Sequence, residues 1–299
     1  MKLFISIGEN NNLQLERLRK ILPSEIVIVE NYLQADIFLL TTWEDKYFTT
    51  KIKAVFIPYT GKNRFPIEKL ASKNIDVYNT HVKSKLVAER AFSMALAVLG
   101  KLMTYDHALR HEGKWLTRDN WGNEFWKSLH DKRCGIVGMG HIGRNLLAYL
   151  KPFNCEIINL ERDRLKGLAN SYVSNIRELI RSSDIIYLCC PQTNDTVNLV
   201  NMTHLDLLDN KVIINVSRGK ILEEEVLYKG LKDGKLYGAG IDVWYQYPVG
   251  GPRYPSKYDL SEFNNLLMSP HASCHVEEFK NDYYDDIFSK IIDYSNDNC

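Results

Sequence analysis

Short apolar stretches alternate with amphipathic stretches along the first eighty residues of the chain. Runs such as KLFISI, ADIFLL and KAVFIP are almost continuously apolar, which is typical of strands buried on both faces of a sheet. Between such runs, LQLERLRKIL and IEKLASKN repeat apolar positions at helical spacing. Strands that alternate with helices predict a parallel sheet covered by helices.

A second alternating series begins at Lys132. We expect its strands near residues 134 to 138, 155 to 160, 184 to 190, 211 to 216, 236 to 241 and 266 to 269. One long helix from about Ser84 to Trp115 is predicted to connect the two series, because its apolar residues recur at helical spacing. A last helix, from about Val276 to Asn296, is expected to pack back on the first series.

These patterns predict an α/β protein of two domains. With 299 residues, of which 45% are hydrophobic, the chain can bury two cores. We expect a discontinuous flavodoxin-like domain formed by residues 1–82 with 276–299. Residues 83–275 are expected to form a Rossmann-type domain with a doubly wound parallel sheet.

The composition excludes some partners and indicates a compartment. The formal net charge is +1, so no overall field attracts nucleic acid. No apolar stretch approaches the roughly 20 residues that span a bilayer, and the apolar segment at the start is too short for a signal peptide. The six cysteines lack CxxC spacing and are interpreted as reduced residues of a cytoplasmic protein.

A glycine motif follows the first strand of the second series. In GMGHIG, Gly138, Gly140 and Gly143 have the G-x-G-x-x-G spacing, and His141 and Ile142 lie inside it. Such glycines provide a tight turn, close approach of the backbone to a pyrophosphate, and close helix packing. We therefore predict a dinucleotide-binding site there.

An acidic residue favours NAD as the cofactor. The next strand, CEIINLE, ends at Glu161, 18 residues after Gly143, where a carboxylate can accept hydrogen bonds from the ribose. A carboxylate repels the 2′-phosphate of NADP, but Arg162 and Arg164 follow and are able to bind that phosphate. NADP therefore stays an alternative.

An arginine ends a strand that is otherwise apolar. The run VIINV is followed by Ser217, Arg218 and Gly219, and ligands of parallel sheets bind beyond the carboxyl ends of the strands. A planar guanidinium can bind a carboxylate through two hydrogen bonds, which lysine cannot do. We expect Arg218 to face the cofactor crevice.

Three segments together resemble the D-isomer-specific 2-hydroxyacid dehydrogenase family, which includes phosphoglycerate dehydrogenases and glyoxylate/hydroxypyruvate reductases. They are GIVGMGHIGR, NVSRGKILEEEVLYKGLKDGKLYGAGIDVW and MSPHAS. The resemblance implies an NAD-dependent enzyme that moves a hydride between nicotinamide and C2 of a small 2-oxo or 2-hydroxy acid, in a cleft between a substrate domain and a cofactor domain. It also implies that Arg218 holds the substrate carboxylate and that His271 is the acid/base.

The chain departs from the family at one position. Most members have glutamate before the proline in D-V-x-x-x-E-P, where it pairs with the histidine. Here the segment is DVWYQYP, and Tyr247 stands in that place. A phenol brings no charge at neutral pH, so we expect the pH profile for reduction to be shifted towards acid.

The resemblance also implies further site residues. Asp242 matches an aspartate that contacts the nicotinamide carboxamide, and Cys190, Pro191 and Ser217 lie in segments that line the nicotinamide pocket. The substrate-binding residues implied in the first domain are Thr60, Gly61, Lys62 and His81.

Two alternatives and an assembly state complete the predictions. A sensor of NAD(H) similar to a corepressor, with weak or no turnover, is the main alternative, and a formate dehydrogenase is a weaker one. The histidines at positions 107 and 111 have no third ligand after them, and those at 271 and 275 lie across a strand-to-loop segment, so no metal is predicted. By resemblance, a homodimer is expected, with Trp115, Trp121 and Trp126 at the subunit contact.

Overall fold

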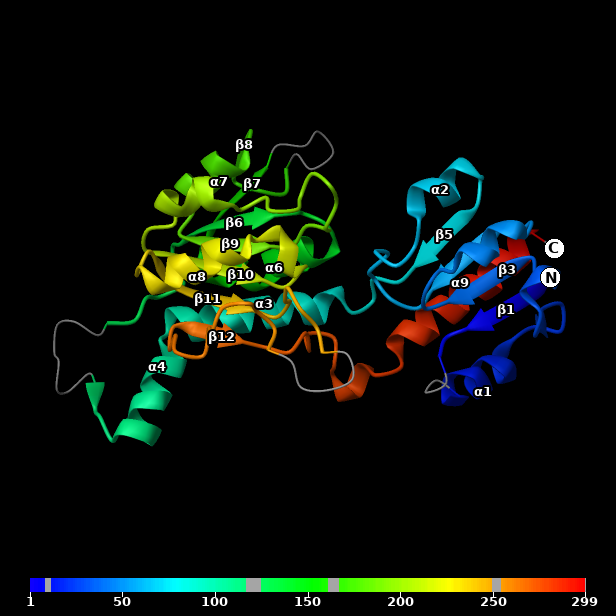
Figure 1. Cartoon of the computed structure of the whole chain (residues 1–299), viewed down its shortest axis with the longest axis horizontal. Helices are drawn as coiled ribbons and strands as arrows, with labels where there is room; N and C mark the ends of the chain where they lie inside the picture. The colour runs from blue at the N-terminus through cyan, green and yellow to red at the C-terminus, as the bar shows by residue number, and fades with distance from the viewer. Residues whose placement is uncertain (9–11, 117–124, 161–166, 249–253, 299) are drawn as a thin grey trace. The chain divides into compact units, whose positions relative to one another are not determined.

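The apolar runs form the strands of two parallel sheets, as the sequence pattern predicts. The structure is a computed structural model that describes residues 1–8, 12–116, 125–160, 167–248 and 254–298. Its chain divides into two compact units, Met1–Lys83 with Val276–Cys299 and Ser84–His275 (Figure 1).

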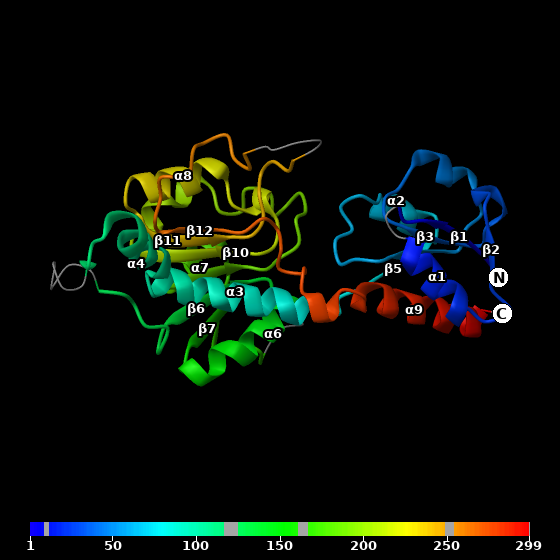
Figure 2. The same cartoon turned by 90° about the horizontal axis from the view of Figure 1, so that it is seen from below.

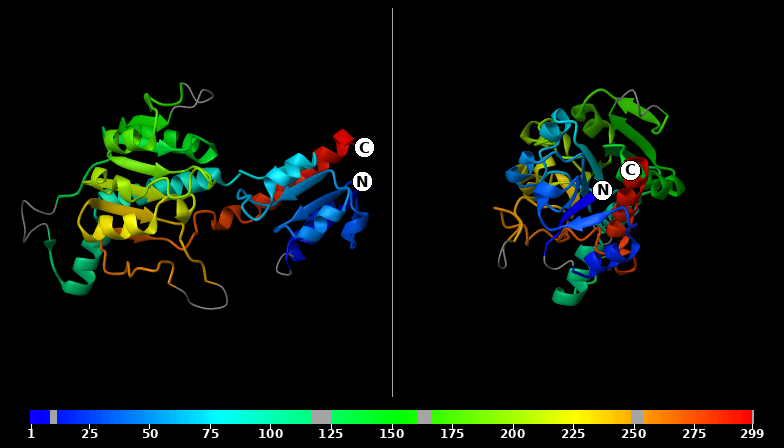
Figure 3. Two further views of the ribbon diagram at one scale, coloured as in Figure 1. Left: turned by 45° about the horizontal axis from the view of Figure 1, so that its top comes forward. Right: turned by 90° about the vertical axis from the view of Figure 1, so that its right-hand side faces the viewer.

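The first unit has the strand order β2-β1-β3-β4-β5, which is the flavodoxin-like order. Its strands are β1 (Lys2–Ser6), β2 (Val27–Val29), β3 (Ile37–Leu40), β4 (Ala54–Ile57) and β5 (Asp76–Asn79). Helices α1 (Asn12–Ile21) and α9 (Asp282–Asn298) share a core on one face, and α2 (Ile67–Ser72) packs on the other. Figure 3 shows α9, in red, along the sheet that it covers.

The second unit has the strand order β12-β11-β10-β9-β6-β7-β8, with every neighbouring pair parallel. The strands are β6 (Arg133–Val137), β7 (Glu156–Leu160), β8 (Ser171–Val173), β9 (Ile185–Leu188), β10 (Lys211–Asn215), β11 (Leu236–Ile241) and β12 (Leu266–Met268). Helices α3 (Ser84–Leu99) and α6 (His141–Leu150) cover one face, whereas α7 (Ile176–Ser182) and α8 (Glu224–Lys232) cover the other (Figure 2).

The prediction of a single long helix after Ser84 is wrong. Helix α3 ends at Leu99, and α4 (Leu102–His107) begins after Lys101, whose φ of 51° is left-handed. Glycine is a poor helix former, and a left-handed residue interrupts the helical hydrogen bonds, so Gly100 and Lys101 separate the two helices. The spacing of apolar residues does not reveal this break, because the same spacing continues on both sides of Gly100 and Lys101.

Strand β8 was not predicted. It has three residues, all half-buried, and it pairs with β7 at one edge of the sheet. A strand this short shows no clear periodicity in the sequence.

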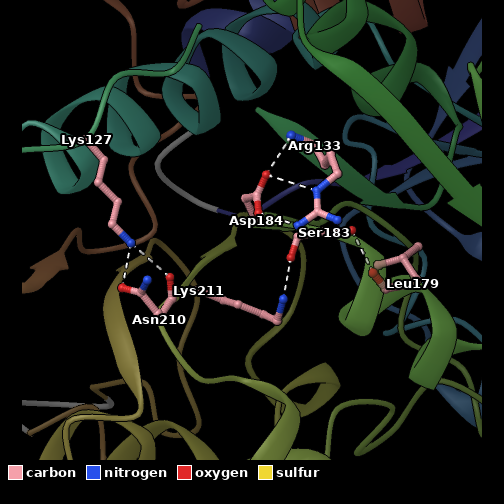
Figure 4. Close-up of polar contacts among 7 residues, drawn as sticks. All are labelled: Lys127, Arg133, Leu179, Ser183, Asp184, Asn210 and Lys211. Atoms are coloured by element: carbon pink, nitrogen blue, oxygen red, sulfur yellow. Dashed lines mark hydrogen bonds and ion pairs between the residues drawn. The ribbon is translucent and has the colours of Figure 1, made fainter. Parts of the chain in front are cut away.

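The amino-terminal edge of the second sheet is held by charged side chains (Figure 4). Arg133 Nη2 lies 2.8 Å from Asp184 Oδ1, so the first residue of β6 is paired with the residue before β9. Lys211 Nζ donates to the carbonyl of Ser183 at 2.6 Å. These contacts bind β6, β9 and β10 together at the edge opposite to their carboxyl ends.

No helix within the described ranges is long and apolar enough to cross a membrane. Of the described cysteines, Cys134, Cys155, Cys189, Cys190 and Cys274 are free thiols.

Candidate active site

The carboxyl ends of β6 and β9 meet where the strand order of the second sheet reverses. From β6, the chain continues outward to β7 on one side, whereas β9 lies on the other side. Ligands of doubly wound sheets bind at this switch point. The amide of Cys189 donates to the carbonyl of Val137 at 2.9 Å, so the two strand ends remain in contact there.

The glycine motif lies at this switch point, and two of its glycines are required by close packing. Gly138 has a φ of 102°, and a Cβ there would lie 2.6 Å from the backbone of Cys190. A Cβ on Gly143 would lie 2.4 Å from the carbonyl oxygen of Gly138. Side chains at either position are excluded, because these distances are too short for any carbon atom.

Gly140 differs, because a Cβ added there would meet nothing within 4 Å. Gly140 precedes α6, which begins with His141 and Ile142, so open space lies in front of a helix N-terminus. Helix N-termini attract anions, and the pyrophosphate of a dinucleotide fits such a place. Glu161, Arg162 and Arg164, on which the choice between NAD and NADP was predicted to depend, lie outside the described residues.

The segment after β9 is held against the segment after β10. Ser217 Oγ donates a hydrogen bond to the carbonyl of Cys190, and Thr196 Oγ1 donates to the carbonyl of Pro191 at 2.7 Å. Cys190 and Ser217 are both buried, and the backbone of Cys190 lies directly beside Gly138. The predicted residues of the nicotinamide pocket are thus brought together.

Arg218 follows β10 in extended backbone and is held by its own turn. Asn215 Nδ2 donates to the carbonyl of Arg218 at 3.0 Å, and the amide of Ser217 donates to Asn215 Oδ1 at 3.2 Å. Arg218 Nη1 donates to the carbonyl of Ser217 at 2.6 Å. Within the described part of the chain, Arg218 forms no ion pair, so its guanidinium can accept an anionic ligand.

Asn215 was not singled out by sequence reasoning, although it is the asparagine of the N-x-x-R-G segment. Its side chain fixes the turn from both ends, which explains an amide at that spacing. The glycine of the same segment is explained by a close approach, because a Cβ on Gly219 would lie 2.2 Å from the carbonyl oxygen of Trp244.

Asp242, at the end of β11, is fully buried and holds the loop after β12. Its Oδ1 accepts hydrogen bonds from Ser269 Oγ at 2.5 Å and from the Ala272 amide at 2.9 Å. Its Oδ2 accepts hydrogen bonds from both the amide and the hydroxyl of Ser273. Burial alone would raise the pKa of Asp242, but these hydrogen bonds keep it below the usual value.

His271 lies in the middle of the loop that Asp242 holds. It is solvent-exposed, and its φ of 58° is left-handed, a conformation that few residues other than glycine adopt. Its pKa is lowered, first by partial loss of hydration and then by the positive charges of Arg218 and His275, while the Asp242 carboxylate acts in the opposite direction. The two serines that fix this loop through Asp242 were not identified from the sequence.

Tyr247 lies beside His271, as its place in the sequence predicts. The two ring centroids are 5.5 Å apart with an interplanar angle of 48°. The hydroxyl of Tyr247 accepts a hydrogen bond from the Trp244 amide at 3.1 Å. Among the described residues, no hydrogen bond joins Tyr247 to His271.

The predicted substrate residues of the first unit gather beyond β4 and β5. Thr60 Oγ1 donates to the carbonyl of Thr80 at 2.8 Å, and Asn79 Nδ2 donates to the carbonyl of Thr60 at 2.9 Å. The same Asn79 nitrogen lies 3.4 Å from His81 Nε2. Gly61 and Lys62 follow in the same turn and are half-buried.

The described residues contain no group of three or more His, Cys, Asp or Glu side chains that could hold a metal ion. His107 and His111 lie side by side, with ring centroids 4.9 Å apart. Glu112 Oε1 lies 3.5 Å from His107 Nε2.

The chain is similar to proteins of known function. The family description "D-isomer specific 2-hydroxyacid dehydrogenase, NAD binding domain" matches residues 92–273. A glyoxylate reductase of Pyrococcus horikoshii is 29% identical over 74% of this chain and 66% of its own length. A glyoxylate reductase of Thermococcus litoralis is 29% identical over 93% of this chain and 88% of its own length.

A solved structure shares the fold. D-Lactate dehydrogenase from Aquifex aeolicus, complexed with NAD and lactic acid, has a TM-score of 0.78 and 20% identity, and the match covers 99% of this chain and 96% of that protein. The family match confirms the resemblance inferred from the three sequence segments. The chain belongs to the D-isomer specific 2-hydroxyacid dehydrogenases, a family of NAD(P)-dependent oxidoreductases, and residues 92–273 are its NAD-binding domain.

Proposed function

We propose that the protein interconverts a small 2-oxo acid and the corresponding D-2-hydroxy acid, with Arg218 as the carboxylate anchor and His271 as the acid/base. The observation that supports this most is that both residues follow strands at the same edge of the second sheet, Arg218 after β10 and His271 after β12, on the two sides of β11. The charge of Arg218 also acts to lower the pKa of His271. A cation that binds carboxylate and a group that titrates near neutral pH are what this reaction needs.

The side chains divide the reaction between them. NADH, when bound at the glycine motif, supplies the hydride that C2 of the oxo acid receives. Arg218 holds the carboxylate through two hydrogen bonds and so fixes the position of C2. His271, when protonated, donates its proton to the carbonyl oxygen as that oxygen becomes a hydroxyl, and it takes the proton back in the reverse direction. Asp242 keeps His271 in place through the loop that it binds.

We further propose NAD as the preferred nucleotide, since Glu161 follows β7 at the distance from the glycine motif at which a carboxylate contacts the ribose. The turn of Thr60, Gly61 and Lys62, together with His81, is proposed to contribute to substrate binding. The hydrogen bonds that gather these residues beyond β4 and β5 support that role.

The replacement Gly140→Ala separates cofactor binding from folding. Because a Cβ at Gly140 meets no protein atom within 4 Å and its φ of −80° suits any residue, the melting temperature is expected to stay within about 2 °C of wild type. NADH affinity is expected to fall by at least about tenfold, because the methyl group occupies space needed by the pyrophosphate. Fluorescence titration with NADH and thermal melting measure the two effects.

Gly138→Ala is the matched comparison. At Gly138 both the φ of 102° and the Cys190 backbone oppose a side chain, so this variant is expected to lose stability as well as NADH affinity. Unchanged NADH binding by Gly140→Ala would contradict a pyrophosphate at Gly140.

The function is tested by following oxidation of NADH, and of NADPH in parallel, against glyoxylate, hydroxypyruvate, pyruvate, phenylpyruvate and 2-oxoglutarate between pH 5 and 8. We expect turnover with at least one of these acids and a lower KM for NADH than for NADPH. Tight NADH binding without turnover of any acid would contradict the enzymatic function and favour the NAD(H)-sensing alternative.

A homodimer is also proposed, on the basis of a run of exposed apolar side chains. Leu102, Leu109, Trp115, Phe125 and Trp126 are each more than half exposed. Such a concentration is typical of a contact surface, and a second copy of the chain is the simplest partner. Trp121 lies outside the described residues. Light scattering is expected to give about twice the 34.6 kDa of one chain, and Trp126→Lys is expected to lower that mass towards one chain.

The predicted cytoplasmic location remains a proposal, which the free thiols support because disulfides are rare in the cytosol. Cell fractionation followed by immunodetection of the protein tests it.

A further inference from the structure

The turn from Trp244 to Tyr247 connects the segments that carry the two proposed reactive residues. The carbonyl oxygen of Trp244 lies against Gly219, which follows Arg218, so closely that no Cβ fits between them. Trp244 Nε1 donates to the carbonyl of Ser269, two residues before His271, at 2.7 Å. Trp244 is itself buried. Its position therefore fixes the ends of β10, β11 and β12 relative to one another.

Tyr247 is fixed by the same tryptophan, through its hydroxyl. The Trp244 amide donates to that oxygen at 3.1 Å, so the phenol is directed back to its own turn. The ring, and not the hydroxyl, is what lies beside the imidazole of His271. Tyr247 is 42% exposed, so part of its ring faces solvent.

The charged groups around His271 do not replace the missing carboxylate. Arg218 approaches from the end of β10 and His275 from the same loop as His271, and both disfavour the protonated imidazole. Asp242, at the end of β11, favours it, but each of its oxygens already accepts two hydrogen bonds from the loop. The fourth neighbour, Tyr247, brings no charge at neutral pH.

We propose that Tyr247 is a positioning residue that acts through its ring: it packs against His271 and fixes the orientation of the imidazole, without a hydrogen bond to it. The inference rests on the proposed function, because it assigns to Tyr247 a part in setting the pH at which His271 works. Because no carboxylate lies at this position beside His271, the imidazole is mainly neutral at neutral pH. In that form it can accept a proton from a hydroxy acid. Reduction of an oxo acid then needs a more acidic medium, because the donor must first be protonated.

Four variants of Tyr247 separate the ring, the hydroxyl and the missing charge. Tyr247→Phe keeps the ring and is expected to leave the pKa of His271 within about 0.3 unit of the wild-type value. Tyr247→Leu and Tyr247→Ala remove the ring, and kcat is expected to fall by about tenfold or more because the imidazole is no longer oriented. Tyr247→Glu is expected to raise the pKa of His271 by at least about one unit, because an opposite charge within ~4–6 Å favours imidazolium.

The pKa of His271 is measured by NMR titration of the whole chain with labelled histidine, and His271→Asn assigns its signal among the 8 histidines. Tyr254→Glu is the matched control: Tyr254 is 40% exposed, its hydroxyl contacts Leu260 and Asp259, and the new charge there is expected to leave the His271 pKa unchanged. Thermal melting of each variant detects loss of folding.

The titration needs no substrate, so it decides the role of Tyr247 even if no oxo acid is turned over. A pKa change of one unit or more in Tyr247→Phe would assign the role to the hydroxyl and overturn the proposal. An unchanged pKa in a folded Tyr247→Glu would also overturn it, because the side chain would then not lie beside His271 in solution.

Discussion

Arg218→Ala is expected to lower kcat/KM for reduction of a 2-oxo acid by about 10²–10⁴-fold. The variant loses two charge-assisted hydrogen bonds to the carboxylate, worth ~1.5–3 kcal/mol each, and every ~1.4 kcal/mol corresponds to a factor of ten. In the folded protein the guanidinium donates to the carbonyl of Ser217, and no described carboxylate pairs with it. Its removal therefore leaves the fold intact and affects the substrate. Steady-state kinetics with NADH at saturation measure the effect.

Two further variants show whether the bidentate geometry matters. Arg218→Lys keeps the positive charge but cannot form two parallel hydrogen bonds to a carboxylate. Its kcat/KM is therefore expected to lie between those of Arg218→Ala and wild type. Arg177→Ala is the control. Arg177 lies on α7 and donates a hydrogen bond to the carbonyl of Thr203, and its removal is expected to leave kcat/KM within about twofold of wild type. Equal activity of Arg218→Lys and wild type would exclude bidentate binding.

The sheets could be predicted because their strands are buried on both faces. In β3, β4 and β9 every residue is buried, and a continuous apolar run in the sequence results directly from that environment. The prediction failed for β8, a strand of three residues that are all half-buried. The break at Gly100 and Lys101 was missed for another reason: apolar residues on both sides continue to pack in the same core, so the periodicity does not change.

The residues of the site could be predicted where close backbone packing restricts which residue type fits. Gly138, Gly143 and Gly219 are explained by atoms that leave no room for a side chain, and this need appears in the sequence as glycine at fixed spacing. The network of Asp242 with Ser269, Ala272 and Ser273 joins segments that are about thirty residues apart. Serine has many roles at strand ends, so its part there becomes visible only when β11 and β12 lie side by side.

The direction of the Tyr247 hydroxyl could not be inferred from the sequence either. The position identified the residue that faces His271, but a phenol can contact an imidazole through its hydroxyl or its ring. Which part of Tyr247 faces His271 depends on the Trp244 amide, which donates a hydrogen bond to the Tyr247 hydroxyl because the chain turns between these residues. The chemistry of the site thus depends on a local backbone contact that leaves no pattern in the sequence.

His271→Asn is expected to lower kcat/KM for reduction by about 10²–10⁴-fold, which is the usual contribution of a general acid. A kinetic pH profile then tests whether His271 is the group that transfers the proton. Asparagine is the suitable replacement, because it tolerates the left-handed φ of 58° better than most residues and therefore preserves the loop. Loss of hydration and the charges of Arg218 and His275 lower the pKa of His271. The protonated donor therefore becomes scarce at a lower pH than for an ordinary histidine.

For the wild-type protein, kcat/KM for reduction is expected to be constant at low pH and to fall tenfold per pH unit above the pKa of His271, which lies below the usual ~6.5. For oxidation of the hydroxy acid the dependence is reversed, since the neutral imidazole is then the reactive form, and kcat/KM falls below that same pKa. The residual activity of His271→Asn should lose this pH dependence in both directions. A variant that keeps the wild-type slope would show that another group transfers the proton, because a side chain that no longer titrates cannot produce the profile.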